Sequence, residues 1–294
     1  MMHEWQVAFA TGSSSPTVTE DDALAAKACL RQGIVCGGAA WDDPAVDWSR
    51  FDAVVLRSTW NYYMKLAEFL QWYRVCSDKC LVFNPVDLVF WNSDKRYLLR
   101  LAEAGFDVPR TVIVSNRDAT KLSELLRTHR WRAAVIKPSV SANAFETALV
   151  TWDSIDAAEA QLERMLLNGD VLLQEFMEEI RGDGEMSLMF FNGIFSHAVL
   201  KSPTANEFRV QEHAGGSVLA ANPSAAVISS ASSILRHVSA AAPLYARVDG
   251  IVTNDRFVLM ELELIEPDLF FRHSRPSADT FARELAGRLQ NRRA

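Results

Sequence analysis

The sequence predicts a protein of mixed α/β and α+β class that is built from successive units. Strand and helix patterns alternate through the first third of the chain, which is typical of a doubly wound parallel sheet. A smaller α+β unit follows, and two hairpin patterns then indicate an antiparallel sheet in the last third. The predicted boundaries are 1–84 for the first domain, 85–114 for a linker helix and strand, 115–177 for the small unit and 178–294 for the last unit.

The composition is that of an ordinary globular protein. Of the 294 residues, 49% are apolar and 23% are charged, which argues against disordered, collagen-like and coiled-coil chains. The formal net charge is −7 and the pI is near 5.4, whereas a general nucleic-acid-binding protein usually carries a basic face. We therefore expect no nucleic-acid partner.

Neither the cysteines nor the first residues indicate secretion or a membrane. Cys29, Cys36, Cys76 and Cys80 lie in periodic apolar segments with no histidine cluster nearby, which predicts reduced thiols. No apolar run approaches the roughly 18 residues of a membrane span, and residues 1–15 lack the features of a signal peptide. We expect a cytoplasmic protein without a membrane partner.

In the first unit, strands and helices have recognisable ends. Thr19 and Asp22 resemble a capping box before a helix that stops at Gly33. The run 51–56 is nearly all apolar, as expected of a strand that is covered on both faces. The predicted strands are 6–11, 34–41, 51–56 and 79–83, and the second predicted helix is 62–76.

The linker and the small unit follow the same logic. A helix with Asn92 or Ser93 as its cap and Gly105 as its stop precedes an extended segment over 106–114. In the small unit, an irregular loop over 139–146 interrupts the regular elements. These are predicted as helices over 118–129 and 154–167 and strands over 133–138, 147–152 and 171–177.

Two hairpins dominate the last unit. Asn192-Gly193 is the strongest short hairpin signal, between strands over 185–191 and 194–201. A second hairpin joins strands over 244–252 and 257–264 through Asn254-Asp255-Arg256. The predicted helices of this unit are 223–241 and 278–290.

The second hairpin gathers charged side chains on one face. Residues two apart on a strand share a face, so Arg247 lies beside Asp249 and Glu261 beside Glu263. A three-residue loop would place Asp249 opposite Glu261, whereas a two-residue loop would turn Glu261 to the other face. Three converging carboxylates repel one another unless a cation lies between them, and their oxygens suit Mg²⁺ or Mn²⁺. The alternative is a solvated edge of the hairpin.

Four basic residues stand on apolar backgrounds. Lys95 lies near the start of the linker helix and Lys137 ends a strand, so each could contact a phosphate. Lys201 and Arg209 are in similar positions, and the alternative for all four is an ordinary surface residue with a buried stem. The apolar strand 171–177 runs into Glu178 and Glu179; a purine could bond to its backbone, or it could be a plain core strand.

A polar-aromatic segment follows the buried strand 51–56. Ligands of open α/β sheets bind at the carboxyl ends of the strands, which makes this segment a candidate substrate site. Its candidate contacts are Arg57, Ser58, Thr59, Trp60 and Tyr62. Trp60 and Tyr62 could instead cap the core, and His197 is either a substrate-binding residue, a base, or a satisfied histidine of its strand.

The order of these pieces resembles the ATP-grasp superfamily of ATP-dependent carboxylate–amine ligases across nearly the whole chain. Several segments look like the branch that contains the O-ureido-serine cyclo-ligase of cycloserine biosynthesis, which is related to bacterial glutathione synthetase. These segments are Trp41–Pro44, Val54–Tyr62, Trp91–Tyr97, Lys137–Ala142 and Phe195–Lys201.

The resemblance implies an ATP-grasp fold in which 115–177 is the lid, and it assigns roles to the candidate residues. Asp249, Glu261 and Glu263 would hold two Mg²⁺ (or Mn²⁺) ions, while Arg247, with Arg209 and Lys201, would be catalytic. Arg209 alternatively binds the substrate carboxylate, and Glu178 or Glu185 the ribose. The implied ATP-binding residues are Lys95, Lys137, Ser141, Gln174, Glu175, Phe176, Met177, Glu178 and Glu185.

The implied reaction is the ATP-dependent formation of an amide through an acyl phosphate, within one small amino-acid-like molecule or between two. A small-molecule kinase and a non-catalytic nucleotide-binding regulator are the alternatives. The resemblance also implies a homodimer as one oligomeric state. Two departures stand out: Glu263 occupies a position where many members have Asn, and the loop 139–146 contains no glycine.

Overall fold

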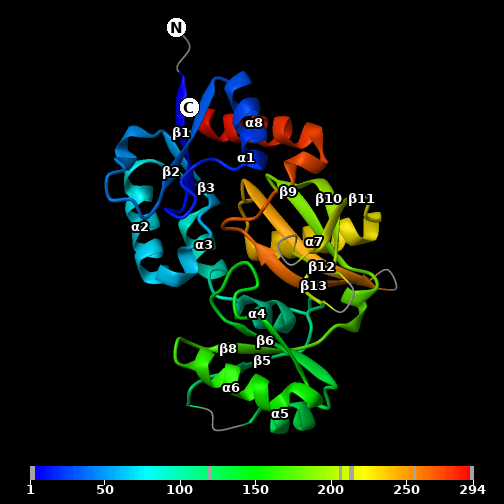
Figure 1. Ribbon diagram of the computed structural model, residues 1–294. Coiled ribbons are helices and arrows are strands. Elements are labelled where there is room, and N and C mark those ends of the chain that lie inside the picture. The colour runs from blue at the N-terminus through cyan, green and yellow to red at the C-terminus, as the bar shows by residue number, and fades with distance from the viewer. Residues whose placement is uncertain (1–3, 118–120, 205–206, 212–214, 254–255, 292–294) are drawn as a thin grey trace.

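The structure, a computed structural model, contains three four- or five-stranded sheets (Figure 1). It describes residues 4–117, 121–204, 207–211, 215–253 and 256–291. One sheet is parallel and the other two are antiparallel, so the predicted fold class is confirmed.

The first sheet is parallel, in the order β2-β1-β3-β4. Its strands are β1 (Trp5–Thr11), β2 (Ile34–Ala40), β3 (Ala53–Ser58) and β4 (Leu81–Phe83). On one face, Phe9 packs at an edge against Phe281, with ring centroids 6.3 Å apart, and on the other face Ala8 and Ala10 share a core with Phe69. Alternate residues of β1 are thus buried on opposite sides, which explains the continuous apolar pattern.

Helices cover both faces of this sheet. They are α1 (Glu20–Arg31) and α8 (Arg275–Gln290) on one side and α2 (Leu66–Lys79) on the other, with 3₁₀ turns at η1 (Trp48–Arg50) and η2 (Tyr62–Lys65). The predicted cap is confirmed, because Thr19 Oγ1 accepts a hydrogen bond from the Asp22 amide at 3.1 Å. The last helix, α8, packs against α1 and so lies with the first unit (Figure 1).

The linker departs from the prediction of one helix that begins at Asn92 or Ser93. Two short helices, α3 (Val86–Asn92) and α4 (Tyr97–Glu103), are separated by a turn. The turn is fixed from outside, since the Lys95 amide donates to the Ser139 carbonyl at 2.7 Å. Asn92 ends α3, and its amide group bonds to the backbone of Leu262 and Leu264 instead of capping a helix.

The second sheet is antiparallel, in the order β5-β8-β6-β7. Ala134 and Ile136 pack under the helices, whereas Val135 and Lys137 face the opposite way, into a cavity. The predicted helix over 118–129 is present as α5 (Leu122–His129), and 118–120 lie outside the described residues. The other elements are β5 (Thr111–Val114), β6 (Ala133–Pro138), β7 (Ala148–Thr151), η3 (Trp152–Ser154), α6 (Ile155–Leu166) and β8 (Val171–Glu175).

The third sheet is antiparallel, in the order β11-β10-β9-β12-β13. The hairpin at Asn192-Gly193 is confirmed, and both residues have positive φ, 51° and 76°, as a tight turn of this kind requires. The elements of this unit are η4 (Glu178–Arg181), β9 (Glu185–Phe191), β10 (Ile194–Ser202), β11 (Ser217–Ala221), α7 (Ala225–Val238), β12 (Tyr245–Thr253), β13 (Arg256–Glu263) and η6 (Phe271–His273).

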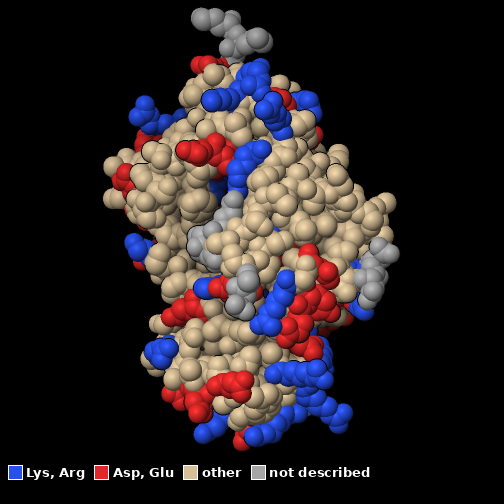
Figure 2. Space-filling view, turned by 45° about the vertical axis from the view of Figure 1, so that its right-hand side comes forward, with Lys and Arg blue, Asp and Glu red and all other residues tan. Residues whose placement is uncertain are grey.

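Charge is unevenly spread over the surface. Figure 2 shows a broad area without Lys, Arg, Asp or Glu on the side where β11 and α7 lie, and the sequence carries none of these residues over 215–235.

The four cysteines are free thiols. Within the described ranges, no helix is long and apolar enough to cross a membrane.

Candidate active site

A cavity of about 300 Å³ lies between the second and third sheets and reaches Trp60 and Tyr62 of the first unit. Its walls come from β6, the end of β8, β10 and the β12–β13 hairpin. Apolar side chains around Phe176 and Met260 form one part, and charged side chains from Lys95 to Asp249 form the other.

The register of the β12–β13 hairpin brings the predicted charges together. Asp249 lies opposite Glu261 and Arg247 opposite Glu263, as predicted. The reason differs from the prediction: Thr253 pairs with Arg256, so the connection spans two positions, 254–255, which lie outside the described residues. A bulge at Met260 then adds one residue to β13 and restores the face that the shorter turn would have reversed.

Hydrogen bonds from side chains that are distant in the sequence hold β13 and the residues just after it in place. Asn84, which is fully buried, donates to the Tyr245 and Leu264 carbonyls at 2.9 and 2.8 Å. The Tyr97 hydroxyl bonds to both backbone groups of Leu262, at 2.9 and 3.0 Å. The backbone that carries Glu261 and Glu263 is therefore anchored at Leu262 and at Leu264.

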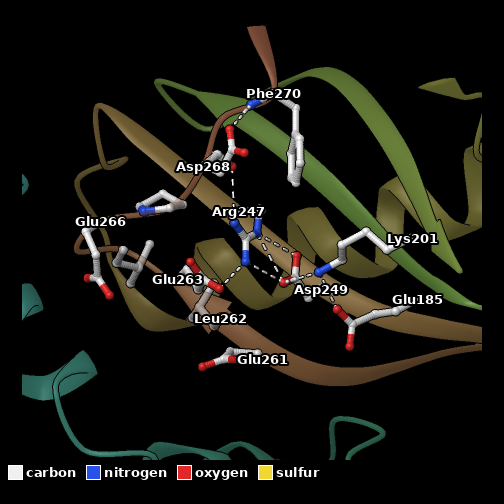
Figure 3. A network of polar contacts seen from close by, with 12 residues as sticks. Glu185, Lys201, Arg247, Asp249, Glu261, Leu262, Glu263, Glu266, Asp268 and Phe270 are labelled. Carbon is white, nitrogen blue, oxygen red and sulfur yellow. Dashed lines mark hydrogen bonds and ion pairs between the residues drawn. The ribbon is translucent and has the colours of Figure 1, made fainter. Parts of the chain in front are cut away.

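An ion-pair network occupies the centre of the charged wall (Figure 3). Arg247 Nε lies 3.0 Å from Asp249 Oδ1, and the same guanidinium bonds to Glu263. Lys201 Nζ lies 3.1 Å from Asp249 Oδ2 and also pairs with Glu185. Burial alone would raise the pKa of Asp249, but Arg247 and Lys201 outweigh burial and lower that pKa to about 2.

Two lysines extend the positive charge toward the second sheet. Lys95 Nζ lies 2.8 Å from Glu261 Oε1 and donates to the Ser141 carbonyl at 2.7 Å. Lys137 Nζ donates to Gln174 Oε1 at 3.1 Å. Burial, reinforced by repulsion from Lys95, lowers the pKa of Lys137 to about 8 even though Glu261 opposes the change.

Acidic groups exceed the positive charge available to them. Burial and the neighbouring carboxylates raise the pKa of Glu263 to about 7 despite Arg247. Burial and Glu263 likewise raise the pKa of Glu266 to about 8. Across the described part of the chain, no three His, Cys, Asp or Glu side chains form a ready metal cluster. Asp249, Glu261 and Glu263 each contact a Lys or Arg side chain instead.

The structure brings most of the predicted site residues to this cavity. Gln174 also bonds to Thr111, Glu175 pairs with Arg110 at the rim, and Arg209 pairs with Glu207. The predicted residues that line the cavity are Trp60, Tyr62, Lys95, Lys137, Ser141, Gln174, Glu175, Phe176, Met177, Glu185, Lys201, Arg209, Arg247, Asp249, Glu261 and Glu263.

Five predicted residues lie elsewhere. Arg57 is buried against Asp22, with 2.8 Å between Nε and Oδ1, and Ser58 and Thr59 are buried beside it. Glu178 points to solvent and pairs with Arg181 at 3.0 Å. His197 Nε2 lies 2.9 Å from the Leu269 carbonyl, and burial lowers the pKa of this histidine. These contacts give each of the three charged or titratable groups a structural partner outside the cavity.

Sequence reasoning missed Glu266, Asp268 and Phe270, which also line the cavity. The Asp268 carbonyl accepts from Arg247 Nη1 at 3.2 Å, and the Phe270 ring lies 5.7 Å from the same guanidinium. The signal that could have found the two acids is the acidic run that continues past Glu263 to Asp268.

Comparisons with known proteins point to one family. A family model described as the N-terminal domain of the D-cycloserine synthetase DcsG matches residues 7–84. The cycloserine biosynthesis protein DcsG of Streptomyces lavendulae is 33% identical, over 97% of this chain and 99% of its own.

Solved structures agree with this match. The crystal structure of D-cycloserine synthetase DcsG superposes with a TM-score of 0.87 at 29% identity, covering 97% of this chain and 99% of that one. The ATP-grasp ligase PsnB, solved with a precursor variant, Mg and ADP, has a TM-score of 0.64 at 14% identity, with 95% and 98% covered. The second likeness concerns the fold alone.

Proposed function

The chain belongs to the DcsG family of ATP-grasp ligases, and we propose that it uses ATP to close an amide-type ring within a small amino-acid-like acid. The observation that carries the proposal is the wall formed by Arg247, Lys201 and Lys95 around the carboxylates of the β12–β13 hairpin. It combines cations for phosphoryl and carboxyl groups with oxygen ligands for a divalent metal.

The residues present fit a nucleotide. Phe176, Met177, Val135 and Met260 form an apolar surface next to Lys137 and Lys95. A base would pack on the apolar side chains, and its phosphates would meet the two lysines, with Gln174 and Ser141 as neighbouring polar groups. Glu185 rather than the exposed Glu178 is the better candidate for the ribose, because it lines the cavity.

The residues also fit Mg²⁺, with Mn²⁺ as an alternative. Asp249, Glu261 and Glu263 offer only oxygen ligands. Burial, followed by repulsion from Glu261 and Asp249, raises the pKa of Glu263 to about 7, and a divalent cation would counter this repulsion. Each carboxylate contacts a lysine or arginine in the structure. We expect nucleotide and metal to bind together. The phosphates would pair with Lys95 and Arg247, and the metal would bind the carboxylates that these two residues contact in the structure.

The chain's own residues then have distinct tasks. ATP supplies the phosphoryl group that activates the substrate carboxylate as an acyl phosphate, and a nitrogen of the same molecule then displaces phosphate. Arg247 and Lys201, with Arg209, would hold the carboxylate and neutralise the transferred group. The unit 115–177 would exclude water from the acyl phosphate as a lid. No protein nucleophile is required.

The test is ADP release with ATP and Mg²⁺ across amino acids, dipeptides and O-ureido-D-serine, followed by mass spectrometry. A dehydrated cyclic product supports the proposal, a joined product indicates intermolecular ligation, and a phosphate ester indicates a kinase. ATP binding without turnover on any compound would favour a nucleotide-binding regulator. Loss of turnover in Glu261→Gln would exclude that last possibility.

We include a homodimer in the proposal as the expected oligomeric state. Light scattering coupled to size-exclusion chromatography tests it directly, since a dimer has twice the 32.8 kDa mass of the chain.

A further inference from the structure

Glu266 differs from the other acids of the cavity. Glu175, Glu185, Asp249, Glu261, Glu263 and Asp268 each form an ion pair with a lysine or arginine. Within the part of the chain that the structure describes, no ion pair or hydrogen bond joins the Glu266 carboxylate to another residue. Figure 3 shows this carboxylate directed away from Arg247 and its partners.

We propose that Glu266 binds the ammonium group of the substrate and so restricts this site to acids that carry a primary amine. The inference rests on the proposed function and names its substrate class more closely. A carboxyl group that lines a binding cavity without an ion pair to a lysine or arginine has its oxygens free for a ligand cation, and such a cation would favour the ionised form of the group.

The surroundings of Glu266 suit an ammonium group. Trp60 Nε1 donates to the Glu266 carbonyl at 3.3 Å, which fixes the backbone at this point, and Pro267 follows directly. Tyr62 lines the same part of the cavity, and burial together with the charge of Glu266 raises the pKa of its hydroxyl. Aromatic faces beside a carboxylate are a common environment for amine cations.

The position of Glu266 also separates two charges of the ligand. The Arg247–Lys201 group lies on β12 and β10 and suits the carboxylate that is activated, whereas Glu266 lies on the extension of β13 beside Trp60. A zwitterionic amino acid can satisfy both ends at once. A hydroxy acid or an N-acylated acid would cover the half-buried Glu266 without offering it a cation, which disfavours the binding of such a ligand.

The experiment compares two ligands that differ in the amine alone. Calorimetry with ADP and Mg²⁺ present measures O-ureido-D-serine against its des-amino analogue, 3-(ureidooxy)propanoic acid. We expect the wild type to prefer the amine by about 10- to 100-fold, the range of a charge-assisted hydrogen bond. Glu266→Gln should reduce that preference to less than about threefold and leave the affinity for ADP unchanged.

Two variants make the comparison interpretable. Glu266→Asp keeps the charge on a shorter side chain and should retain part of the preference. Glu163→Gln makes the same chemical change on the exposed face of α6 and should behave as wild type. A wild type without preference, or a Glu266→Gln variant that keeps it, overturns the inference.

The proposed function is tested separately by the ring product. A wild-type protein that forms no ring refutes the ring closure, and the role of Glu266 is still supported if the wild type prefers the amine and Glu266→Gln loses that preference. Ring formation with an unchanged preference in Glu266→Gln refutes the role of Glu266 alone.

Discussion

The two walls of the cavity are built differently. On the third sheet, Asp249 is held by Arg247 and Lys201, and Asn84 and Tyr97 fix the backbone around β13. On the second sheet, Lys137 contacts the neutral side chain of Gln174, and burial lowers its pKa to about 8. In the third-sheet wall, here called the matched wall, each of Asp249, Glu261 and Glu263 already contacts a lysine or arginine, although acids are in excess there. The second wall offers the cation of Lys137, which a ligand must pair with.

The loop 139–146 belongs to the second wall and shows the same contrast. Asn143, Ala144 and Glu146 have φ of 53°, 54° and 52°, a left-handed backbone that costs a non-glycine residue roughly 1 kcal/mol or more. The Phe145 ring lies 5.0 Å from Tyr63 of the first unit, and Gln161 donates to the Glu146 carbonyl at 2.9 Å. The loop is thus held by few contacts around a strained backbone, which supports the lid role proposed for the unit 115–177.

Asp249→Asn should have the largest effect because it breaks the matched wall. Arg247 and Lys201 would lose the negative charge that orients both, and the proposed metal site would lose a ligand. We expect kcat for ADP release to fall on the order of 10³-fold, in the range of losing a preorganised charge. A fall of less than about threefold, with an unchanged melting temperature, would contradict this role.

Lys137→Ala tests the second wall and should lower kcat/KM for ATP by about 100-fold, since one phosphate contact is removed. The wild type adds a pH test. Lysine is charged below its pKa, so with a pKa of about 8 the cation disappears as the pH rises through 8, and kcat/KM for ATP should fall above that pH.

Lys137→Arg is the matched control for this pH dependence, because arginine stays charged throughout the range. The fall above pH 8 should vanish in this variant, whatever its absolute rate. A pH profile that is identical in wild type and Lys137→Arg would mean that another group causes the fall.

Phe145→Ala should loosen the proposed lid and mainly change how tightly ATP hydrolysis is coupled to ring formation. Without the contact to Tyr63, water would reach the acyl phosphate more often, so the ratio of ADP released to ring formed should rise several-fold. Trp152→Ala is a matched control on the same unit, since Trp152 is 43% exposed and Phe145 is 44% exposed. Equal ratios in the two variants would refute a specific role for the Phe145 contact.

The sequence predicted the charged residues of the matched wall better than the long-range contacts that hold them in place. Alternation along two strands placed Arg247, Asp249, Glu261 and Glu263 on one face, and this held although the turn is shorter than predicted. The bulge at Met260 compensates for the turn, and no local pattern marks it. The register of a strand pair is constrained because one whole face is buried. The pairing could therefore be predicted without the correct loop length.

Long-range partners could not be predicted. Asn92 is a residue type that often caps helices, but its partners are Leu262 of β13 and Leu264 just beyond this strand, 170 and 172 positions along the chain. Arg57 lies near the carboxyl end of β3, where ligand-binding residues are often found, yet Asp22 neutralises it inside the protein. The strand β11 was not predicted either, because Ser217–Ala221 combines small residues with little alternation.

Glu266→Gln should have the smallest effect, on stability, and it sharpens the contrast because Glu266 is a carboxyl group without an ion pair beside the matched wall. A carboxyl whose pKa is about 8 in the folded protein and ordinary when unfolded binds a proton more tightly when folded. Stability from this group is therefore lost as the pH rises from about 4.5 through 8.

Glutamine cannot lose a proton, so the variant should escape this loss. We expect equal melting temperatures near pH 5 and a variant that melts several degrees higher at pH 8.5, because a loss of about 1 kcal/mol already lowers the melting temperature of a domain of 150–250 residues by about 2–4 °C. Adding ADP, Mg²⁺ and O-ureido-D-serine should reduce the difference in melting temperature between wild type and variant, because the ammonium group of the substrate would give the Glu266 carboxylate a positive partner. Melting curves that stay parallel across this pH range would show that the pKa of Glu266 is the same in the folded and the unfolded protein.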